Sequence, residues 1–299
     1  MSRRFNLHTE AGHGLIRLQS LQAVDELVGS VMELLEANPE VLANTYILYT
    51  SDNGYHIGQH RLPPGKTCNI DEDINIPLVI RGPGVAKGDT VSFPTSHTDL
   101  TPTFFKLAGI PLRDDFDGTP IPVTQAAQDA PGQKQEHINV EYWGNAGVEG
   151  TSAFTNLDED TQLRNNTYKT LRLVSEDYDF MYAVWCTNDH ELYNIKDDPS
   201  EMVNLYGSNS TTAGLNIAQL TNRLDTLLLT LKACKGIVCR QPWQALFPSG
   251  DVQTLRDAMC PKYDEFFQNQ PKVTFSACLY GQLLEYEGAL TPNIYSSCA

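Results

Sequence analysis

Long apolar runs are missing from this sequence, and no stretch approaches the roughly 18 residues that a membrane-spanning helix needs. The first residues, MSRRFNLHTEAGHG, lack the apolar segment of roughly 7 to 15 residues that marks a secretory signal peptide. Positive charge is scarce as well, because 21 Lys and Arg stand against 37 Asp and Glu and leave a formal net charge of −16. An acidic protein repels phosphate backbones, so we expect no membrane span and no nucleic-acid partner.

The cysteine pattern lacks a second close Cys pair or a pair of histidines that would complete a four-ligand zinc site. Seven cysteines are present, mostly in the last third among glycines, prolines and polar turns, and this distribution favours disulfides over reduced thiols. An odd count leaves at least one thiol if all bonds are internal. Two N-glycosylation sequons agree with an exported glycoprotein. The cysteines are Cys68, Cys186, Cys234, Cys239, Cys260, Cys278 and Cys298, and the sequons are Asn165-Asn166-Thr167 and Asn209-Ser210-Thr211.

The first part of the chain has the alternating pattern of an α/β layer. Apolar residues from Leu21 to Leu35 recur at helical spacing and predict an amphipathic helix. TYILYT (45–50) and INIPLVIRGPG (74–84) are β-rich, mostly apolar runs, typical of strands that are covered on both faces. SHTDLTPTFFKLAGI (96–110) predicts a helix with Thr101 as N-cap and a stop at its glycine. This order predicts an α/β fold with a largely parallel sheet and flanking helices.

A second region begins after the turn-rich stretch 111–135, and we predict domains at 1–128 and 129–299. With 299 residues and 41% hydrophobic residues, the chain can form one large or two modest cores. The second domain is predicted to be a small α+β unit with an antiparallel sheet. Its expected strands are HINVEYW (137–143), YKTLRLV (168–174), FMYAVWCT (180–187) and the start of ELYNIKDDPSEMVNLY (191–206), followed by a helix over 217–232.

Polar side chains gather directly after the first expected strand, in SDNGYHIGQHRLPPGK (51–66). In open α/β sheets, ligands lie beyond the carboxyl ends of the strands. Asp52 and Asn53 offer hard oxygen ligands that suit calcium, although calcium takes about 6 to 8 of them. The alternative is a plain turn, because Asp, Asn and Gly favour turn conformations. His56, His60 and Lys66 are by themselves ordinary polar loop residues.

A family resemblance favours the first of these interpretations. YTSDNGYHIGQHRLPPGK, DEDINIPLVIRGPGV, SHTDLTPTFFKLAGI and DGTPI follow one another as in the second half of the catalytic domain of sulfatases, which this part of the chain resembles. The likeness is to the fungal arylsulfatase and N-acetylglucosamine-6-sulfatase types. NNTYKTLRLV and WCTNDHELYNIKDDPSEMVNLY resemble the C-terminal subdomain of that family. The resemblance implies part of an alkaline-phosphatase-like α/β fold and a sulfuric ester hydrolase that acts on a sulfate-ester small molecule or a sulfated sugar.

The resemblance also implies roles for individual residues. Asp52 and Asn53 match the pair that binds Ca²⁺ in the family, and Lys66 matches the lysine that contacts the sulfate. His60 corresponds to a residue that lines the pocket, so we expect it to contact the substrate. His56 is a weaker candidate for a residue of the site. A divalent cation and an ammonium group would together neutralise the charge that develops on the sulfate oxygens.

One family feature does not occur in these 299 residues: the C-x-P-S-R motif whose cysteine becomes the formylglycine nucleophile. Cys68, in KTCNIDED, lacks the required neighbours. The resemblance places the remaining calcium ligands in an N-terminal half that this chain lacks, so we expect weak calcium binding and a truncated or inactive form. We expect the full-length family member to be secreted or to reside in a lysosome-like or vacuole-like compartment. The alternatives are a non-catalytic binding remnant, or a phosphodiesterase or phosphatase of the same superfamily.

Overall fold

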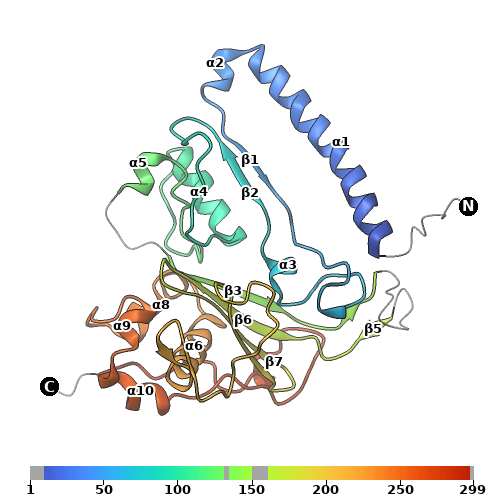
Figure 1. Cartoon of the computed structure of the whole chain (residues 1–299). Helices are drawn as coiled ribbons and strands as arrows, with labels where there is room; N and C mark the ends of the chain where they lie inside the picture. Colours follow the sequence, from blue (N-terminus) through green and yellow to red (C-terminus); the bar gives the residue numbers. More distant parts are fainter. Residues whose placement is uncertain (1–9, 131–134, 150–160, 297–299) are drawn as a thin grey trace, which may run out of the picture. The chain divides into compact units, whose positions relative to one another are not determined.

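The computed structural model describes residues 10–130, 135–149 and 161–296, and they form two compact units (Figure 1). Each unit is assembled from separate stretches of the chain. The first unit comprises Met1–Asp89, Val123–Ala130 and Asn145–Arg164, and the second comprises Thr90–Pro122, Pro131–Gly144 and Asn165–Ala299. The predicted domain boundary between residues 128 and 129 stays a prediction.

The first unit begins with the long helix α1 (Glu10–Glu36), which confirms the helix expected over 21–35 and extends it toward the N-terminus. The short helix α2 follows, with Asn38 at its N-cap position and Pro39 as its first residue, because proline is well suited to the first turn of a helix. None of the described helices has both the length and the apolar character needed to cross a bilayer. The other elements of this unit are α2 (Pro39–Leu42), β1 (Ile47–Thr50), η1 (Gln59–Arg61), α3 (Asp71–Ile74), β2 (Leu78–Arg81), α5 (Gln125–Gln128), β4 (Ala146–Gly147) and β5 (Gln162–Leu163).

The sheet of the first unit differs from the expected parallel sheet. Strands β1 and β2 pair with each other in antiparallel register, from Ile47 opposite Arg81 to Thr50 opposite Leu78. The chain between them contains only the short helices η1 and α3 and loops, whereas the crossover connection of a parallel pair is usually a longer helix. Every strand pair in the described residues is antiparallel, so the prediction of a largely parallel sheet was wrong.

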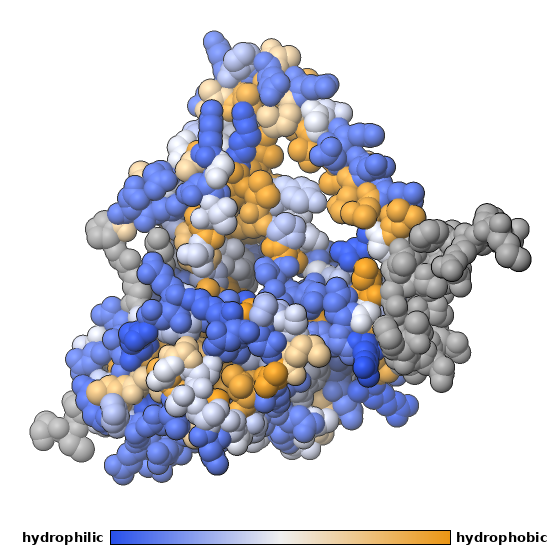
Figure 2. Space-filling view, in the orientation of Figure 1, coloured by the Kyte–Doolittle hydropathy of each residue, from blue (hydrophilic) through white to orange (hydrophobic). Residues whose placement is uncertain are grey.

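Apolar side chains of the first unit are exposed rather than covered. From residue 14 to 36 no side chain of α1 is buried, and Leu18, Leu27 and Leu34 are 65%, 64% and 68% exposed. No residue of β1 is buried either, and Val79 of β2 is 60% exposed. Figure 2 shows hydrophobic side chains on the visible surface of this part of the chain. The strands were expected to be covered on both faces, and that expectation was wrong for this structure.

The second unit confirms the predicted α+β arrangement with an antiparallel sheet. Its four strands lie in the order β3-β6-β7-β8, and each neighbouring pair is antiparallel. The sheet strands are β3 (His137–Tyr142), β6 (Tyr168–Val174), β7 (Asp179–Trp185) and β8 (His190–Asn194). The other elements are η2 (His97–Asp99), α4 (Leu100–Leu107), β9 (Thr211–Thr212), β10 (Leu215–Asn216), α6 (Ile217–Leu231), α7 (Ile237–Arg240), α8 (Pro242–Leu246), α9 (Leu255–Ala258), η3 (Pro261–Tyr263), α10 (Asp264–Gln268) and η4 (Leu284–Tyr286).

The main hydrophobic core lies in this second unit, where α6 packs on strands β6 and β7. Asn216 caps α6, because its side-chain oxygen accepts the backbone N–H of Gln219. Leucines at helical spacing along α6 are fully buried against alternate residues of the strands. The fully buried members include Leu171, Leu173, Phe180, Leu220, Leu224, Leu227 and Leu228.

The start of helix α4 differs from the prediction. Ser96, and not Thr101, begins this helical segment with a capping box, in which Ser96 and Asp99 each bond the other's backbone. Asp99 is buried and also accepts the N–H of Thr119, so the cap joins α4 to the following loop. The predicted stop is confirmed, because Gly109 follows the helix with a φ of 68° that favours glycine.

Two disulfides confirm the prediction made from the cysteine distribution. Cys186 after strand β7 is bonded to Cys278, and Cys234 is bonded to Cys239. The first bond joins segments 92 residues apart, and the second closes a loop of five. Cys186 is buried in the main core, so the longer link fastens the C-terminal segment to the sheet.

Asp225 of helix α6 makes the stability of the second unit depend on pH. The carboxylate is buried, which raises its pKa to about 6 despite hydrogen bonds from Tyr182 and Val273. Between about pH 4 and 6 the folded chain therefore keeps a proton that the unfolded chain has lost. We expect Asp225 by itself to lower the free energy of unfolding by about 2–3 kcal/mol as the pH rises through this range, and Asp225→Asn to remove this contribution.

Urea unfolding at a series of pH values measures this effect. Asp251→Asn is the matched control, because Asp251 is an exposed carboxylate of the same unit. A profile in Asp225→Asn as steep as in the unsubstituted chain would contradict the prediction.

Candidate functional site

The loop after strand β1 is held in place by backbone hydrogen bonds at two points. The amides of Gly54 and Tyr55 donate to the carbonyls of Asp73 and Glu72 in helix α3, over 2.8 and 2.9 Å. Gly54 lies so close to α3 that an added Cβ would be 1.9 Å from the Glu72 carbonyl oxygen. Only glycine fits there, and the Asp-Asn-Gly turn is therefore fixed against α3.

The second point is a pair of backbone hydrogen bonds between His56 and Gly65, of 3.0 and 3.1 Å. They form an antiparallel bridge and close the loop between these two residues. Lys66 follows the bridge directly, so its backbone is fixed relative to the turn that carries Asp52 and Asn53.

The Asp52-Asn53 pair lies in a turn after β1, as the sequence predicts. Asp52 is exposed, and its Oδ1 accepts the backbone N–H of Asn53 over 2.9 Å. The hydroxyl of Ser51 donates to the Asn53 carbonyl over 2.8 Å. These bonds make the turn itself stable. The carboxylate and amide remain a donor set that suits calcium, although they supply only two of its about 6 to 8 oxygens.

Lys66 carries a half-exposed ammonium group. Its Nζ lies 4.0 Å from Oε1 of Glu149, and the two side chains are 41% and 44% exposed. An ion pair this long between exposed groups contributes little to stability, so the ammonium is available to an anion. Glu149 also lies beside Tyr55, and burial together with this carboxylate raises the pKa of Tyr55 to about 12.

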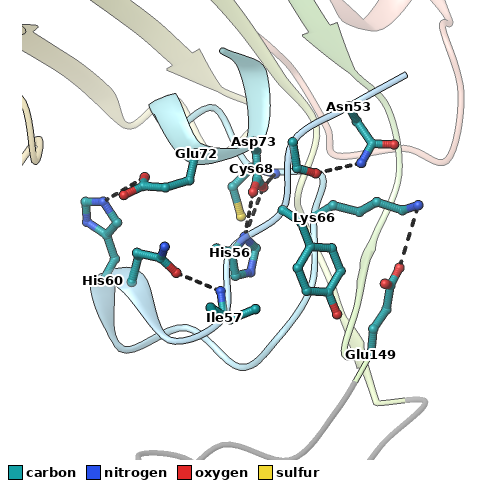
Figure 3. Close-up of polar contacts among 12 residues, drawn as sticks. Asn53, His56, Ile57, His60, Lys66, Cys68, Glu72, Asp73 and Glu149 are labelled. Carbon is teal, nitrogen blue, oxygen red and sulfur yellow. Dashed lines mark hydrogen bonds and ion pairs between the residues drawn. The ribbon is translucent and has the colours of Figure 1, made fainter. Parts of the chain in front are cut away.

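His60 lies apart from this pair. Its Nε2 is 3.9 Å from Oε2 of Glu72, and its backbone has a φ of 54°. Arg61 and Thr67, in the same loop, also have positive φ values of 60° and 78°. Such conformations are uncommon for residues other than glycine and cluster at functional sites. In Figure 3 the side chains of Asn53 and Lys66 extend to one side of the loop, and His60 lies on the other.

Sequence reasoning missed two residues outside this loop that contact its side chains. Glu149 is 83 residues beyond Lys66, and no local pattern links the two. Asp73 is buried, and its Oδ1 lies 2.8 Å from Nδ1 of His56. Its Oδ2 accepts a hydrogen bond from the backbone N–H of Cys68. The sequence shows Asp73 only as one of three consecutive acidic residues, and nothing in that run distinguishes it from its neighbours.

Residues 16–110 match the family model described as Sulfatase. They include both strands of the hairpin, the loop with Asp52, Asn53 and Lys66, and helix α4. Over these residues the chain is similar to sulfatases, which confirms the resemblance seen in the sequence.

Several proteins named as sulfatases are similar to the chain over most of its length. Sulfatase ppz1 of Metarhizium majus (strain ARSEF 297) is 57% identical over 282 residues, which are 94% of this chain and 58% of that protein. The arylsulfatase of Volvox carteri is 35% identical over 280 residues, which are 88% of this chain and 41% of that protein. The N-acetylglucosamine-6-sulfatase of Bos taurus is 33% identical over 242 residues, 76% of this chain and 41% of that protein. The chain thus spans between 41% and 58% of the length of these relatives.

Among solved structures, BT4656 in complex with its substrate D-glucosamine-2-N,6-O-disulfate shares the fold. The superposition has a TM-score of 0.51 at 29% identity and covers 63% of this chain and 35% of that one. The predicted sulfatase-type α/β fold is confirmed, with the antiparallel sheets described above in place of a largely parallel one.

Proposed function

We propose that this chain forms the calcium- and sulfate-binding part of a sulfuric ester hydrolase. The observation that carries the proposal is the shared frame of Asp52, Asn53 and Lys66, all within the segment that matches the sulfatase family model. The Asp52-Asn53 pair and Lys66 are positioned by the same backbone hydrogen bonds, which join the turn to helix α3 and His56 to Gly65. A carboxylate with an amide and an ammonium group are the donors that a cation and a sulfate require.

The negatively charged and neutral oxygen ligands would bind the cation, and the positively charged lysine would bind the sulfate. Asp52 and Asn53 would hold Ca²⁺, which when bound polarises a sulfate oxygen. Lys66 places a positive charge on a flexible stem beside the same turn and would bind the sulfate oxygens as their negative charge grows in the transition state. The loose contact with Glu149 would give way to a stronger anion at little cost.

A sulfated sugar is the substrate class that we propose. The support comes from the N-acetylglucosamine-6-sulfatase relative and from the disulfated glucosamine bound by BT4656. His60 would contact the sugar at the edge of the site, on the side of the loop away from Lys66. The nucleophile would come from a C-x-P-S-R segment outside these 299 residues, and the chain alone is expected to have no hydrolase activity.

Calcium binding by the chain tests the metal part of the proposal. We expect isothermal titration to detect weak binding of one Ca²⁺, and Asp52→Asn to weaken it by about tenfold or more, because the ligand charge largely sets calcium affinity. Asp25→Asn is the matched control, since Asp25 is an exposed carboxylate on helix α1. Equal calcium affinity in Asp52→Asn and the unsubstituted chain would refute the assignment.

The activity is tested on a longer polypeptide that joins these residues to a C-x-P-S-R segment. We expect hydrolysis of an aryl sulfate and of a 6-sulfated glucosamine. Sulfate binding without turnover in that polypeptide would favour a non-catalytic binding protein. Faster turnover of phosphate esters than of sulfate esters would favour a phosphodiesterase or phosphatase.

A further inference from the structure

Three side chains of different chemistry meet where the loop contacts helix α3. His56 and Asp73 are 3% and 5% exposed, and Cys68 is half-buried. Nδ1 of His56 lies 2.8 and 3.0 Å from the two carboxylate oxygens of Asp73. The nitrogen, sulfur and oxygen that the three residues offer all lie within 4.8 Å of one another. In Figure 3 the sulfur of Cys68 points toward the contact between His56 and Asp73.

The fold brings these three residues together by the same bonds that build the loop. His56 is fixed by its bridge to Gly65, and Asp73 is fixed because its carbonyl accepts the N–H of Gly54. The backbone N–H of Cys68 donates to Oδ2 of Asp73 over 2.8 Å and orients the carboxylate. The carboxylate is thus held between an imidazole and the cysteine backbone, which is a preorganised arrangement rather than a chance encounter of flexible surface groups.

We propose that His56, Cys68 and Asp73 bind a transition-metal ion of the zinc type. Imidazole, thiolate and carboxylate are ligands that Zn²⁺ accepts together, whereas Ca²⁺ takes oxygen ligands only. A neutral imidazole with one thiolate and one carboxylate carries two negative charges, and a divalent ion neutralises them. The resulting neutral site suits a buried position, where an uncompensated charge is costly.

The distances are compatible with one ion at the centre of the three groups. Bonds of about 2.0–2.3 Å to nitrogen, oxygen and sulfur place tetrahedral ligand atoms about 3.3–3.8 Å apart. The His56–Asp73 separation is shorter than this, because a hydrogen bond joins the two groups. A metal ion between them would therefore require the two side chains to move apart. Three protein ligands leave a fourth position for water or another ligand.

Metal binding here would stiffen the loop that carries Lys66. His56 and Cys68 lie on its two arms, and Asp73 belongs to α3, on which the Asp-Asn-Gly turn is fixed. A metal that joins all three closes the loop a second time, next to the backbone bridge. The site is separate from Asp52 and Asn53, and it stands or falls independently of the proposed function.

Titration with Co²⁺, a spectroscopic substitute for Zn²⁺, tests the proposal on the chain with its disulfides intact. We expect one equivalent to bind, with a thiolate-to-cobalt charge-transfer absorption in the near ultraviolet that Zn²⁺ abolishes and Ca²⁺ does not. Cys68→Ser should remove this absorption and weaken binding by about 100-fold or more, since even an outer-shell partner is worth about 10–100-fold in metal affinity. Cys260→Ser is the matched control, because Cys260 is an exposed cysteine thiol of the second unit, and it should leave the absorption unchanged.

Alkylation of the unsubstituted chain gives a second readout that does not depend on a variant's folding. We expect Zn²⁺ to slow the reaction of Cys68 with iodoacetamide by about tenfold or more, because the bound thiolate is no longer a free nucleophile, and to leave Cys260 unaffected. Equal alkylation rates of Cys68 with and without Zn²⁺ would overturn the proposal. A charge-transfer absorption that persists in Cys68→Ser, or one that never appears, would overturn it as well.

Discussion

Lys66→Met should lower kcat/KM for an aryl sulfate by about 10²–10³-fold in a polypeptide that joins these residues to a C-x-P-S-R segment. The reason is that Lys66 is proposed to stabilise negative charge that grows on the sulfate oxygens, and methionine keeps the length of the side chain without its charge. Because the Lys66–Glu149 contact is long and exposed, its loss should leave the free energy of unfolding nearly unchanged. Steady-state kinetics and urea unfolding of the same variant separate the two effects.

Lys87→Met is the matched control for this variant. Lys87 is an exposed lysine of the same unit, outside the loop after β1, and its substitution should leave kcat/KM unchanged. Lys66→Arg keeps the charge but changes its shape, so we expect it to retain part of the activity. Turnover by Lys66→Met equal to that of the unsubstituted polypeptide would show that the ammonium does not contact the reacting sulfate.

Replacing both Cys186 and Cys278 with serine should lower the free energy of unfolding of the second unit by about 4–5 kcal/mol. In the chain-entropy model, the cost grows with the length of the closed loop, and a separation of 92 residues gives about 4.6 kcal/mol. Because Cys186 lies in the main core, the substitution also leaves a buried polar group there. Urea unfolding followed by circular dichroism measures the difference.

The Cys234–Cys239 disulfide provides an internal comparison. It closes a separation of only five residues, for which the same model gives about 2 kcal/mol. The double serine variant at this second position should therefore be the more stable of the two. Equal losses from the two bonds would show that loop length does not determine their contributions.

The four-stranded sheet and helix α6 of the second unit were predictable because each has a strong local signal. Leucines at helical spacing defined α6, and alternating β-branched and aromatic residues defined β6 and β7. Strand direction in the first unit was not predictable in the same way, because apolar runs such as 45–50 fit both parallel and antiparallel sheets. The direction depends on the connection, and the short α3 does not form the crossover helix that a parallel pair requires.

The candidate site was predictable only where family resemblance named its residues. Asp52, Asn53 and Lys66 lie within 15 positions and could be found from one quoted segment. The contacts of His56 with Asp73, and of Lys66 with Glu149, depend on how the loop closes on helix α3 and on a later stretch of the chain. Spacing along the sequence carries no record of that closure, so these partners required the structure.

The uncovered leucines of α1 have a practical consequence for every stability measurement suggested above. Environment-sensitive dyes that fluoresce on contact with apolar surface should bind the native chain at Leu18, Leu27 and Leu34 and give a bright signal before any heating. Dye-based melting curves would then begin from a high baseline and understate the transition. Optical methods that follow the backbone itself are the appropriate choice for this chain.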